Sequence, residues 1–200
     1  IEIEKLPLAL HDLLKDLIPA HQTTASRKNL ALSLQINQFV PTHIISDPVR
    51  INQILNNLVS NAIKFTDRGK NIYLNVNQFQ GRRKSDPPYP MIVVSIKDEG
   101  KGIPQKELQK IFDRFTQLKE YSKSDGRGLG LTVAKQISTL HDGNLWVESE
   151  EGRGSTFNVL FPHVVSRTMA PDFMMGQNEI KKVLVIILNF TKIMNPKLQF

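Results

Sequence analysis

Apolar residues near the start of the chain recur at helical spacing. Recurrence every three or four positions gives an amphipathic helix one buried stripe. The stripe consists of Leu10, Leu13, Leu14, Leu17 and Ile18. Pro19 is expected to kink or interrupt this helix, because proline removes a backbone donor and crowds the preceding turn. The pattern is compatible with a resumption of the helix towards Lys28.

The next segment changes to the two-residue alternation of β-strands. Alternation over residues 30–36 predicts a half-buried strand, and residues 43–45 are suited to a short second one. Asp47 and Pro48 then predict a helix start, because aspartate is a favourable N-cap and proline fits the first helical position. We expect this helix to run to about Phe65 and to end before Gly69.

The second half of the pattern predicts a sheet with helices on one of its faces. The expected elements are a hairpin of 71–79 and 91–97, a short helix over 105–112, a mobile loop over 116–128, a helix over 129–140, and strands over 143–148 and 156–161. Together they predict an α+β fold, a two-layer sandwich with a mostly antiparallel sheet. The pattern dissolves at His163 until the strand-like run 181–188, so we expect one domain over 1–162 and a linker and tail over 163–200.

Composition narrows the function classes. The 200 residues include no cysteine, which excludes a disulfide framework, a thiolate zinc site and a cysteine nucleophile. The longest apolar run, 183–188, is far short of the roughly 20 residues that cross a bilayer. The first residues carry no secretory signal, and they look like a cut inside a longer protein.

The net charge of +7 permits contact with nucleic acid, but its distribution does not favour it. Basic residues are scattered, and their one tight cluster, 82–84, lies in a polar, proline-rich segment over 81–90. We interpret this segment as a solvated loop and expect no nucleic-acid partner.

One stripe of the predicted helix 48–65 carries polar side chains that could bind a metal ion and phosphate. Asn57, Asn61 and Lys64 lie at i, i+4 and i+7, within roughly 60° of one another around the helix axis. An amide oxygen can ligate Mg²⁺, and an ammonium can neutralise phosphate oxygens. Leu55, Leu58, Val59 and Ala62 fall on the other side and can face the sheet. A solvated helix face is the alternative reading.

Two glycine-containing segments could approach a ligand closely. Residues 98–102, Asp-Glu-Gly-Lys-Gly, follow a hydrophobic strand; there a carboxylate could accept from an amine while glycines admit a flat ring. Residues 126–131 run into a helix, where loop amides and the helix dipole favour phosphate. The second segment has neither the Rossmann glycine spacing nor the Walker A lysine. A plain turn and a flexible linker are the respective alternatives.

Two further segments carry weaker signals. Residues 152–157 form a second glycine turn into a strand, for which an ordinary hairpin is the alternative. Phe112 and Phe115 could anchor one edge of the loop that follows, or could be core aromatics.

Taken in order, these segments resemble the sequence boxes of histidine kinase catalytic domains. That family shares a superfamily with gyrase B subunits, MutL and the heat-shock chaperone ATPases. The matching segments are an asparagine box at 53–66, glycine boxes at 98–102, 126–131 and 152–157, and a phenylalanine box at 112–115. The resemblance covers about 7–162 and implies the Bergerat ATP-binding fold.

The resemblance implies a role for each matched residue in binding ATP and Mg²⁺. Asn61 would hold Mg²⁺, Asn57 and Lys64 would reach the phosphates, and Asp98 would accept from the adenine amine. The other implied nucleotide contacts are Gly100, Gly102, Ile103, Phe112, Phe115, Arg127, Gly128, Leu129, Gly130, Leu131 and Thr156, with Thr156 near the adenine end and residues 116–127 as a lid.

The lid departs from the commonest family pattern at two positions. Asp125 stands where glycine is frequent, and Arg127 stands where threonine is. We expect altered lid dynamics or affinity from these changes, with the site retained.

The resemblance also separates kinases from hydrolases. The hydrolases place a glutamate one turn before the Mg²⁺ asparagine; here that position is Asn57, which cannot act as a general base. Phosphoryl transfer needs mainly positioning and charge neutralisation, so kinase chemistry is favoured. The alternatives are a nucleotide-binding signalling module without transfer and a hydrolysing ATPase.

The acceptor histidine is expected on another part of the parent protein. His11 superficially imitates an acceptor box, but Asp16 stands where the family has proline, and no dimerisation hairpin fits before the asparagine box. The implied partners are the histidine-bearing dimerisation domain of the same parent and a downstream response regulator. We expect a cytoplasmic domain, with any membrane attachment through other parts of the parent.

The tail faintly resembles the opening strand of a receiver domain. Asn189 suits that pattern, but Ile187 and Leu188 occupy the place of its acidic pair, without which a receiver could not bind its metal. A truncated or non-native tail is the alternative.

Overall fold

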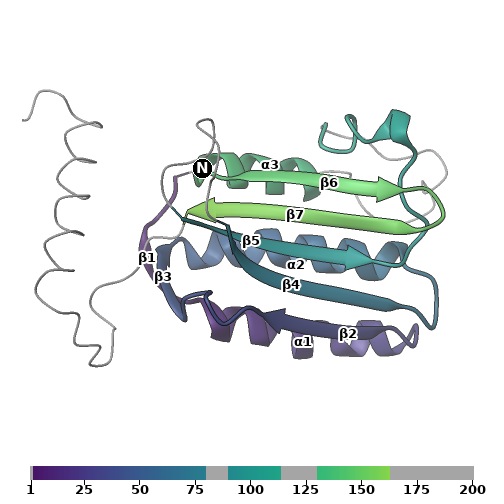
Figure 1. The fold of residues 1–200 in the computed structure, drawn as a ribbon, viewed down its shortest axis with the longest axis horizontal. Coiled ribbons are helices and arrows are strands. Elements are labelled where there is room, and N and C mark those ends of the chain that lie inside the picture. The colour runs from purple at the N-terminus through teal and green to yellow at the C-terminus, as the bar shows by residue number, and fades with distance from the viewer. Residues whose placement is uncertain (1, 80–89, 114–129, 163–200) are drawn as a thin grey trace, which may run out of the picture. The chain divides into compact units, whose positions relative to one another are not determined.

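A five-stranded sheet forms one layer of the fold (Figure 1). The computed structural model describes residues 2–79, 90–113 and 130–162. Strand β2 pairs with β4 in parallel, and the other neighbours are antiparallel, so the expectation of a mixed, mostly antiparallel sheet is confirmed. In spatial order the strands are β2 (Ala31–Ile36), β4 (Asn71–Phe79), β5 (Met91–Asp98), β7 (Gly154–Pro162) and β6 (Asn144–Glu150).

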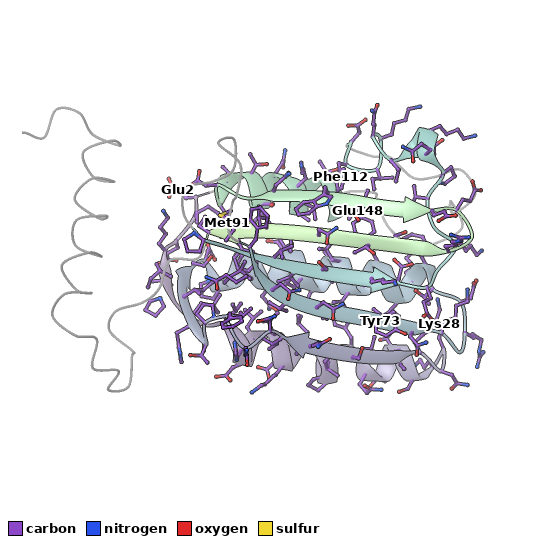
Figure 2. All side chains as sticks on the ribbon, viewed as in Figure 1. Glu2, Lys28, Tyr73, Met91, Phe112 and Glu148 are labelled. Carbon is purple, nitrogen blue, oxygen red and sulfur yellow. The ribbon has the colours of Figure 1, made fainter. Side chains whose placement is uncertain are left out.

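Three helices cover one face of this sheet, behind the strands in Figure 1. They are α1 (Leu10–Ser26), α2 (Pro48–Phe65) and α3 (Gly130–Leu140). The core lies between the two layers and contains fully buried aliphatic residues such as Leu14, Leu58 and Ile96. The opposite face of the sheet carries polar side chains, among them Tyr73 and Glu148 (Figure 2). The predicted α+β two-layer sandwich is confirmed.

The start of α2 follows the predicted capping chemistry. Asp47 is extended at the N-cap, and its Oδ1 accepts from the Arg50 backbone N–H at 3.0 Å, with Pro48 in the first turn. Its other oxygen, Oδ2, accepts from the backbone N–H of Glu4 at 3.0 Å. One buried carboxylate therefore fixes both the helix start and the N-terminal segment.

A short antiparallel pair lies apart from the main sheet. Strand β1 (Leu6–Ala9) pairs with β3 (His43–Ser46), and the alternation pattern gave only the second of these strands. Strand β1 has one buried residue, Leu8. A single buried apolar position in four residues gives no alternation that sequence periodicity could detect.

Two predicted elements differ from the structure. Helix α1 runs without interruption through Pro19, because that residue is exposed and water can satisfy the carbonyl that lacks a partner. The predicted helix over 105–112 is wrong beyond its first turn: only a 3₁₀ turn, η1 (Gln105–Glu107), forms, and turns follow. Ile111 is the one buried residue there, which leaves too small an apolar face to hold an α-helix.

Several sequence predictions fall outside the described residues. These are the loop 116–128, the basic cluster 82–84 and the tail 163–200 with its receiver-like strand. The domain boundary at residue 162 therefore stays a prediction.

Replacing Asp47 by alanine should lower the free energy of unfolding by about 1–2 kcal/mol, because the α2 cap and the Glu4 contact are both lost. Urea denaturation measures the loss. Asp16→Ala, which removes an exposed acid within α1, serves as the control and should change stability by less than about 0.5 kcal/mol. An equal effect of the two substitutions would contradict the capping role.

Candidate nucleotide-binding site

Helix α2 presents its polar stripe away from the core. Asn57, Asn61 and Lys64 are partly exposed, whereas the residues predicted to face the sheet are buried. The Asn61 Nδ2 group donates a long hydrogen bond, 3.5 Å, to Asn57 Oδ1, so the two amides are aligned along the helix. The Lys64 ammonium lies 5.2 Å from the ring centroid of Phe65.

The N-terminus of α3 lies directly against this stripe. Gly130 opens α3, and a Cβ atom added there would overlap the Asn57 amide. The absence of a side chain at Gly130 lets the first turn of α3 lie beside Asn57 with its amide in this position. The first N–H groups of a helix have no partner within it, and the helix dipole adds partial positive charge, so the N-terminus of α3 beside Asn57 favours an anion.

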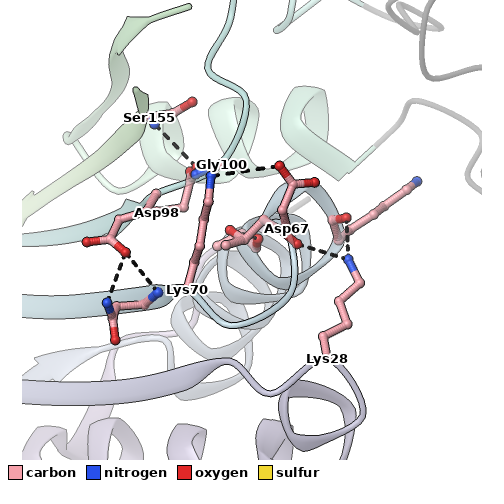
Figure 3. A network of polar contacts seen from close by, with 11 residues as sticks. Lys28, Asp67, Lys70, Asp98, Gly100 and Ser155 are labelled. Atoms are coloured by element: carbon pink, nitrogen blue, oxygen red, sulfur yellow. Dashed lines mark hydrogen bonds and ion pairs between the residues drawn. The ribbon is translucent and has the colours of Figure 1, made fainter. Parts of the chain in front are cut away.

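Asp98 lies at the end of β5, on the face that the helices cover. Its side chain is 4% exposed, and Oδ1 accepts from the backbone N–H groups of Gly100 at 2.9 Å and Ser155 at 3.3 Å (Figure 3). Burial raises the pKa of Asp98 above its ordinary value, although these two amides and the positive charge of Lys70 act in the opposite direction. Among the described residues, none donates to Oδ2, so this oxygen can accept from a ligand.

Glycines shape the backbone that follows Asp98. A Cβ atom at Gly100 would lie 2.6 Å from the Phe65 carbonyl oxygen, so β5 ends in close contact with the end of α2. Gly102 adopts φ +70°, a left-handed conformation that favours glycine, and passes against the Glu150 carbonyl. These two positions admit no larger side chain without displacing backbone.

The two ends of the site are therefore arranged along a single helix. Gly130 contacts α2 at Asn57, and Gly100 contacts it at Phe65, eight residues further on. Eight helical residues rise roughly 12 Å. An anion-binding end and a buried carboxylate end thus flank one exposed stripe, which suits an elongated ligand with a phosphate group at one end and a hydrogen-bond donor at the other.

Comparison with known proteins identifies the family. A family model described as histidine kinase-, DNA gyrase B-, and HSP90-like ATPase matches residues 46–165, more than half of the chain. The chain belongs to this ATPase family. The resemblance that the sequence boxes carried is confirmed.

Curated relatives of this family member are sensor kinases. It is 36% identical over 166 residues to the autoinducer 2 sensor kinase/phosphatase LuxQ of Vibrio parahaemolyticus, covering 80% of this chain and 18% of LuxQ. It is 33% identical over 162 residues to the aerobic respiration control sensor protein ArcB of Escherichia coli, covering 80% of this chain and 20% of ArcB. The chain thus spans about a fifth of the length of these two relatives.

Solved structures of histidine kinases share its fold. Full-length ShkA in complex with AMPPNP matches with a TM-score of 0.70 and 28% identity, covering 83% of this chain and 32% of ShkA. The nucleotide-free catalytic domain of ThkA matches with a TM-score of 0.64 and 26% identity, covering 80% of this chain and 97% of that domain.

Strand register distinguishes Thr156 from its neighbour Ser155. Thr156 pairs with exposed Lys97 on the open face of the sheet, whereas Ser155 pairs with Asp98 and lies on the helix-covered face. The Ser155 amide reaches Asp98, and its hydroxyl lies 3.0 Å from that of Ser149. The assignment of Thr156 to the adenine end stays a prediction, and Ser155 is an additional residue beside Asp98. Side-chain alternation between paired strands could have identified Ser155, had the register been known.

The remaining predicted residues divide into two groups. Ile103, Phe112 and Leu131 are partly buried and pack against the core. The Ile103 N–H donates to Ser149 Oγ at 2.8 Å, and the Lys135 ammonium lies 5.6 Å from the Phe112 ring centroid. Four predicted residues lie outside the described part of the chain: Phe115, Arg127, Gly128 and Leu129.

The polar stripe of α2 offers one oxygen donor that would suit a magnesium ion. Within residues 2–79, 90–113 and 130–162, no cluster of three or more histidine or acidic side chains could enclose a metal. Asn61 uses its amide nitrogen towards Asn57, which leaves its oxygen available as a hard neutral ligand. Mg²⁺ commonly takes few protein ligands and completes its shell with phosphate oxygens and water.

Within the same ranges, no helix has the length and apolar character needed to span a membrane.

Replacing Asp98 by asparagine should change the pH dependence of stability in a defined direction. Because the folded pKa of Asp98 is raised, its contribution to stability is fully present below the unfolded pKa and declines as pH rises through the folded pKa. The free energy of unfolding of the variant minus that of the wild type should therefore increase with pH across that window and then level off. Urea titrations at a series of pH values measure the difference, and a difference that falls with pH would contradict the raised pKa.

Proposed function

We propose that this domain binds Mg-ATP and transfers the γ-phosphoryl group to a histidine on the dimerisation domain of its parent sensor kinase. The observation that carries the proposal is the placement of Gly130 against Asn57 and of Gly100 against the end of the same helix. In this proposal the start of α3 would bind the phosphates and the Asp98 end would bind adenine, roughly 12 Å apart along α2.

Asp98 is suited to recognise adenine. Two backbone amides hold Oδ1, which fixes the carboxylate, and Oδ2 would accept from the exocyclic amine. Guanine presents a carbonyl at the equivalent position, and a carboxylate oxygen facing it would repel it. Gly100 and Gly102 leave room for the flat ring beside the carboxylate.

The stripe of α2 is suited to the triphosphate. Lys64 would neutralise phosphate oxygens, and the first turn of α3 would donate backbone N–H groups to them. The Asn61 oxygen would be the protein ligand of Mg²⁺. When bound, the ion supplies charge neutralisation as the phosphoryl group leaves.

Helix α2 favours transfer to a histidine over hydrolysis. It contains no acidic residue, and Asn57 occupies the place of the hydrolase glutamate, so the helix offers no general base for water. An imidazole acceptor brings its own nucleophilic nitrogen and needs little beyond positioning. The relative LuxQ, which is named as a sensor kinase/phosphatase, supports the kinase assignment.

The described histidines are engaged in structural contacts. The His11 ring lies 3.1 Å from the Val40 carbonyl, and the His21 ring lies 2.9 Å from the Asn56 amide oxygen. His43 Nδ1 lies 3.0 Å from the Thr42 hydroxyl, and His141 is buried. The acceptor would therefore belong to the dimerisation domain, and a response regulator would take the phosphoryl group from it. Both steps would take place in the cytoplasm.

Phosphotransfer can be tested with a separately produced dimerisation and acceptor domain. Incubation of the two proteins with γ-labelled ATP and Mg²⁺ should give acid-labile, alkali-stable label on the acceptor. Measurable ATP binding without phosphohistidine would favour a signalling module that binds nucleotide without transfer. Rapid release of phosphate without acceptor would favour a hydrolase.

Replacing Asn61 by alanine should raise the Kd for Mg-ATP, or lower the transfer rate, at least about tenfold, because a metal ligand is lost while the buried face of α2 is untouched. Fluorescent-nucleotide titration with and without Mg²⁺ measures the effect. Ser60→Ala, on the exposed side of the same turn, is the matched control. Unchanged binding and transfer in Asn61→Ala would remove this residue from the mechanism.

Replacing Asp98 by asparagine should reduce the preference for ATP over GTP at least about tenfold, since a hydrogen bond to a charged group contributes about 1.5–3 kcal/mol. Competition binding with both nucleotides measures the ratio. Asp142→Asn is the control, because Asp142 is exposed and its left-handed conformation suits asparagine equally. An unchanged ratio in Asp98→Asn would reject the adenine-reading role.

A further inference from the structure

The C-terminus of α2 is capped by a lysine from the loop between α1 and β2. The last carbonyls of a helix have no partner within it. The Ala62 carbonyl accepts from Thr66, through the backbone N–H at 3.0 Å and Oγ1 at 2.6 Å. The next carbonyls converge on the Lys28 Nζ, which donates to Ile63 O at 2.9 Å, Lys64 O at 2.8 Å and Thr66 O at 3.2 Å (Figure 3).

This contact uses the full donor capacity of the ammonium group. A lysine ammonium has three N–H donors, and three carbonyl oxygens surround Lys28 Nζ. Its positive charge also lies at the negative end of the α2 dipole, where a cation is stabilising. The arrangement is therefore both a hydrogen-bonded cap and an electrostatic one.

The backbone of Lys28 binds the same connection a second time. The Gly69 N–H donates to the Lys28 carbonyl at 3.0 Å, beyond the segment that the side chain holds. Asn29 turns the chain with φ +53°, and the Leu30 N–H returns to the Ala25 carbonyl at 3.0 Å. The loop between α1 and β2 is thus hydrogen-bonded to α1. It also binds the α2–β4 connection twice, through the Lys28 side chain and through the Lys28 carbonyl.

The carbonyls that Lys28 binds lie at the Asp98 end of the candidate site. Two of them belong to Ile63 and Lys64, two and three positions after Asn61. Gly100 approaches the carbonyl of Phe65, the next residue. A change in the last turn of α2 would therefore move both the Lys64 side chain and the Asp98–Gly100 backbone.

We propose that Lys28 is a positioning residue for nucleotide binding, which sets the last turn of α2 so that Lys64 and Asp98 address one ATP molecule. The proposal rests on the proposed function. Lys28 lies outside the segment 46–165 that the family model matches, and it contacts the site only through the carbonyls of α2. A cap with a purely stabilising role would lower the free energy of unfolding without changing nucleotide affinity in the molecules that remain folded.

The absence of cysteine from the chain allows a direct test. Lys28→Cys creates a single thiol, which bromoethylamine converts to an aminoethyl group that restores an ammonium at nearly the same distance from the backbone. Bromoethanol gives the neutral hydroxyethyl counterpart at the same site. The Kd values for Mg-ATP and Mg-GTP, the Tm, and amide hydrogen exchange at Gly69 and Gly100 are measured for all three forms.

We expect Lys28→Cys and its hydroxyethyl form to bind Mg-ATP at least about tenfold more weakly than the wild type, with faster exchange at Gly69 and Gly100. The aminoethyl form should return the Kd to within about twofold and restore slow exchange. A Kd within about twofold of the wild type in the folded Lys28→Cys variant would overturn the proposal and leave a purely stabilising cap.

Three controls distinguish a positioning role of Lys28 from loss of a surface charge, from general destabilisation and from failure to fold. Lys15→Cys, treated identically, removes and restores an exposed charge on α1 and should leave the Kd unchanged. Leu17→Val trims the core beneath α1 and should lower the Tm with little change in Kd. If Lys28→Cys does not fold, Lys28→Arg serves instead: its planar guanidinium cannot direct three donors from one nitrogen, so the Kd should rise about threefold or more, and a wild-type Kd would overturn the proposal.

Failure of the proposed function can be distinguished from failure of the positioning role of Lys28. A wild-type domain that binds no Mg-ATP would contradict the function itself. Amide hydrogen exchange would then test the positioning role of Lys28 by itself. Unchanged protection of the Gly100 amide in Lys28→Cys would show that the cap does not position the end of β5.

Discussion

The packing of α2 against the sheet is the constraint on which the rest of the site depends. The apolar side chains on its sheet-facing side, from Ile51 to Ile63, are at most 3% exposed, so the helix cannot rotate about its axis without exposing them. That single orientation fixes where Asn57, Asn61 and Lys64 point. The close approaches of Gly130 and Gly100 then become possible, because each needs the α2 backbone or an α2 amide in one place.

The two ends of the site differ in burial and in hydrogen-bonding character. At Asp98, burial works against the charged carboxylate, and backbone amides with the charge of Lys70 compensate part of that cost. At the other end, the helix stripe and the start of α3 offer partly exposed hydrogen-bond donors that a ligand can reach. A buried, fixed acceptor suits recognition of a base, while exposed donors suit a phosphate chain that enters and leaves.

Sequence periodicity predicted the elements well where their apolar faces were long. The cap at Asp47, the helix up to Phe65 and the buried face of α2 followed directly from residue type and spacing. The misses have a common cause: periodicity reports how much apolar surface a segment has, and it does not report what surrounds the segment. Pro19 is tolerated because it faces solvent, and residues 105–112 do not form an α-helix because only Ile111 is buried.

The sequence by itself determined the order of the boxes, the polar stripe of α2 and the family to which the chain belongs, because these depend on residue identity and local spacing. Only the tertiary structure decided that Ser155, rather than Thr156, reaches Asp98, since strand register selects which of two neighbours faces the helices. It also brought Lys28 to the carbonyls at the end of α2, 35 to 38 positions further along the chain. Such contacts arise when separate elements pack together, and no local pattern encodes them.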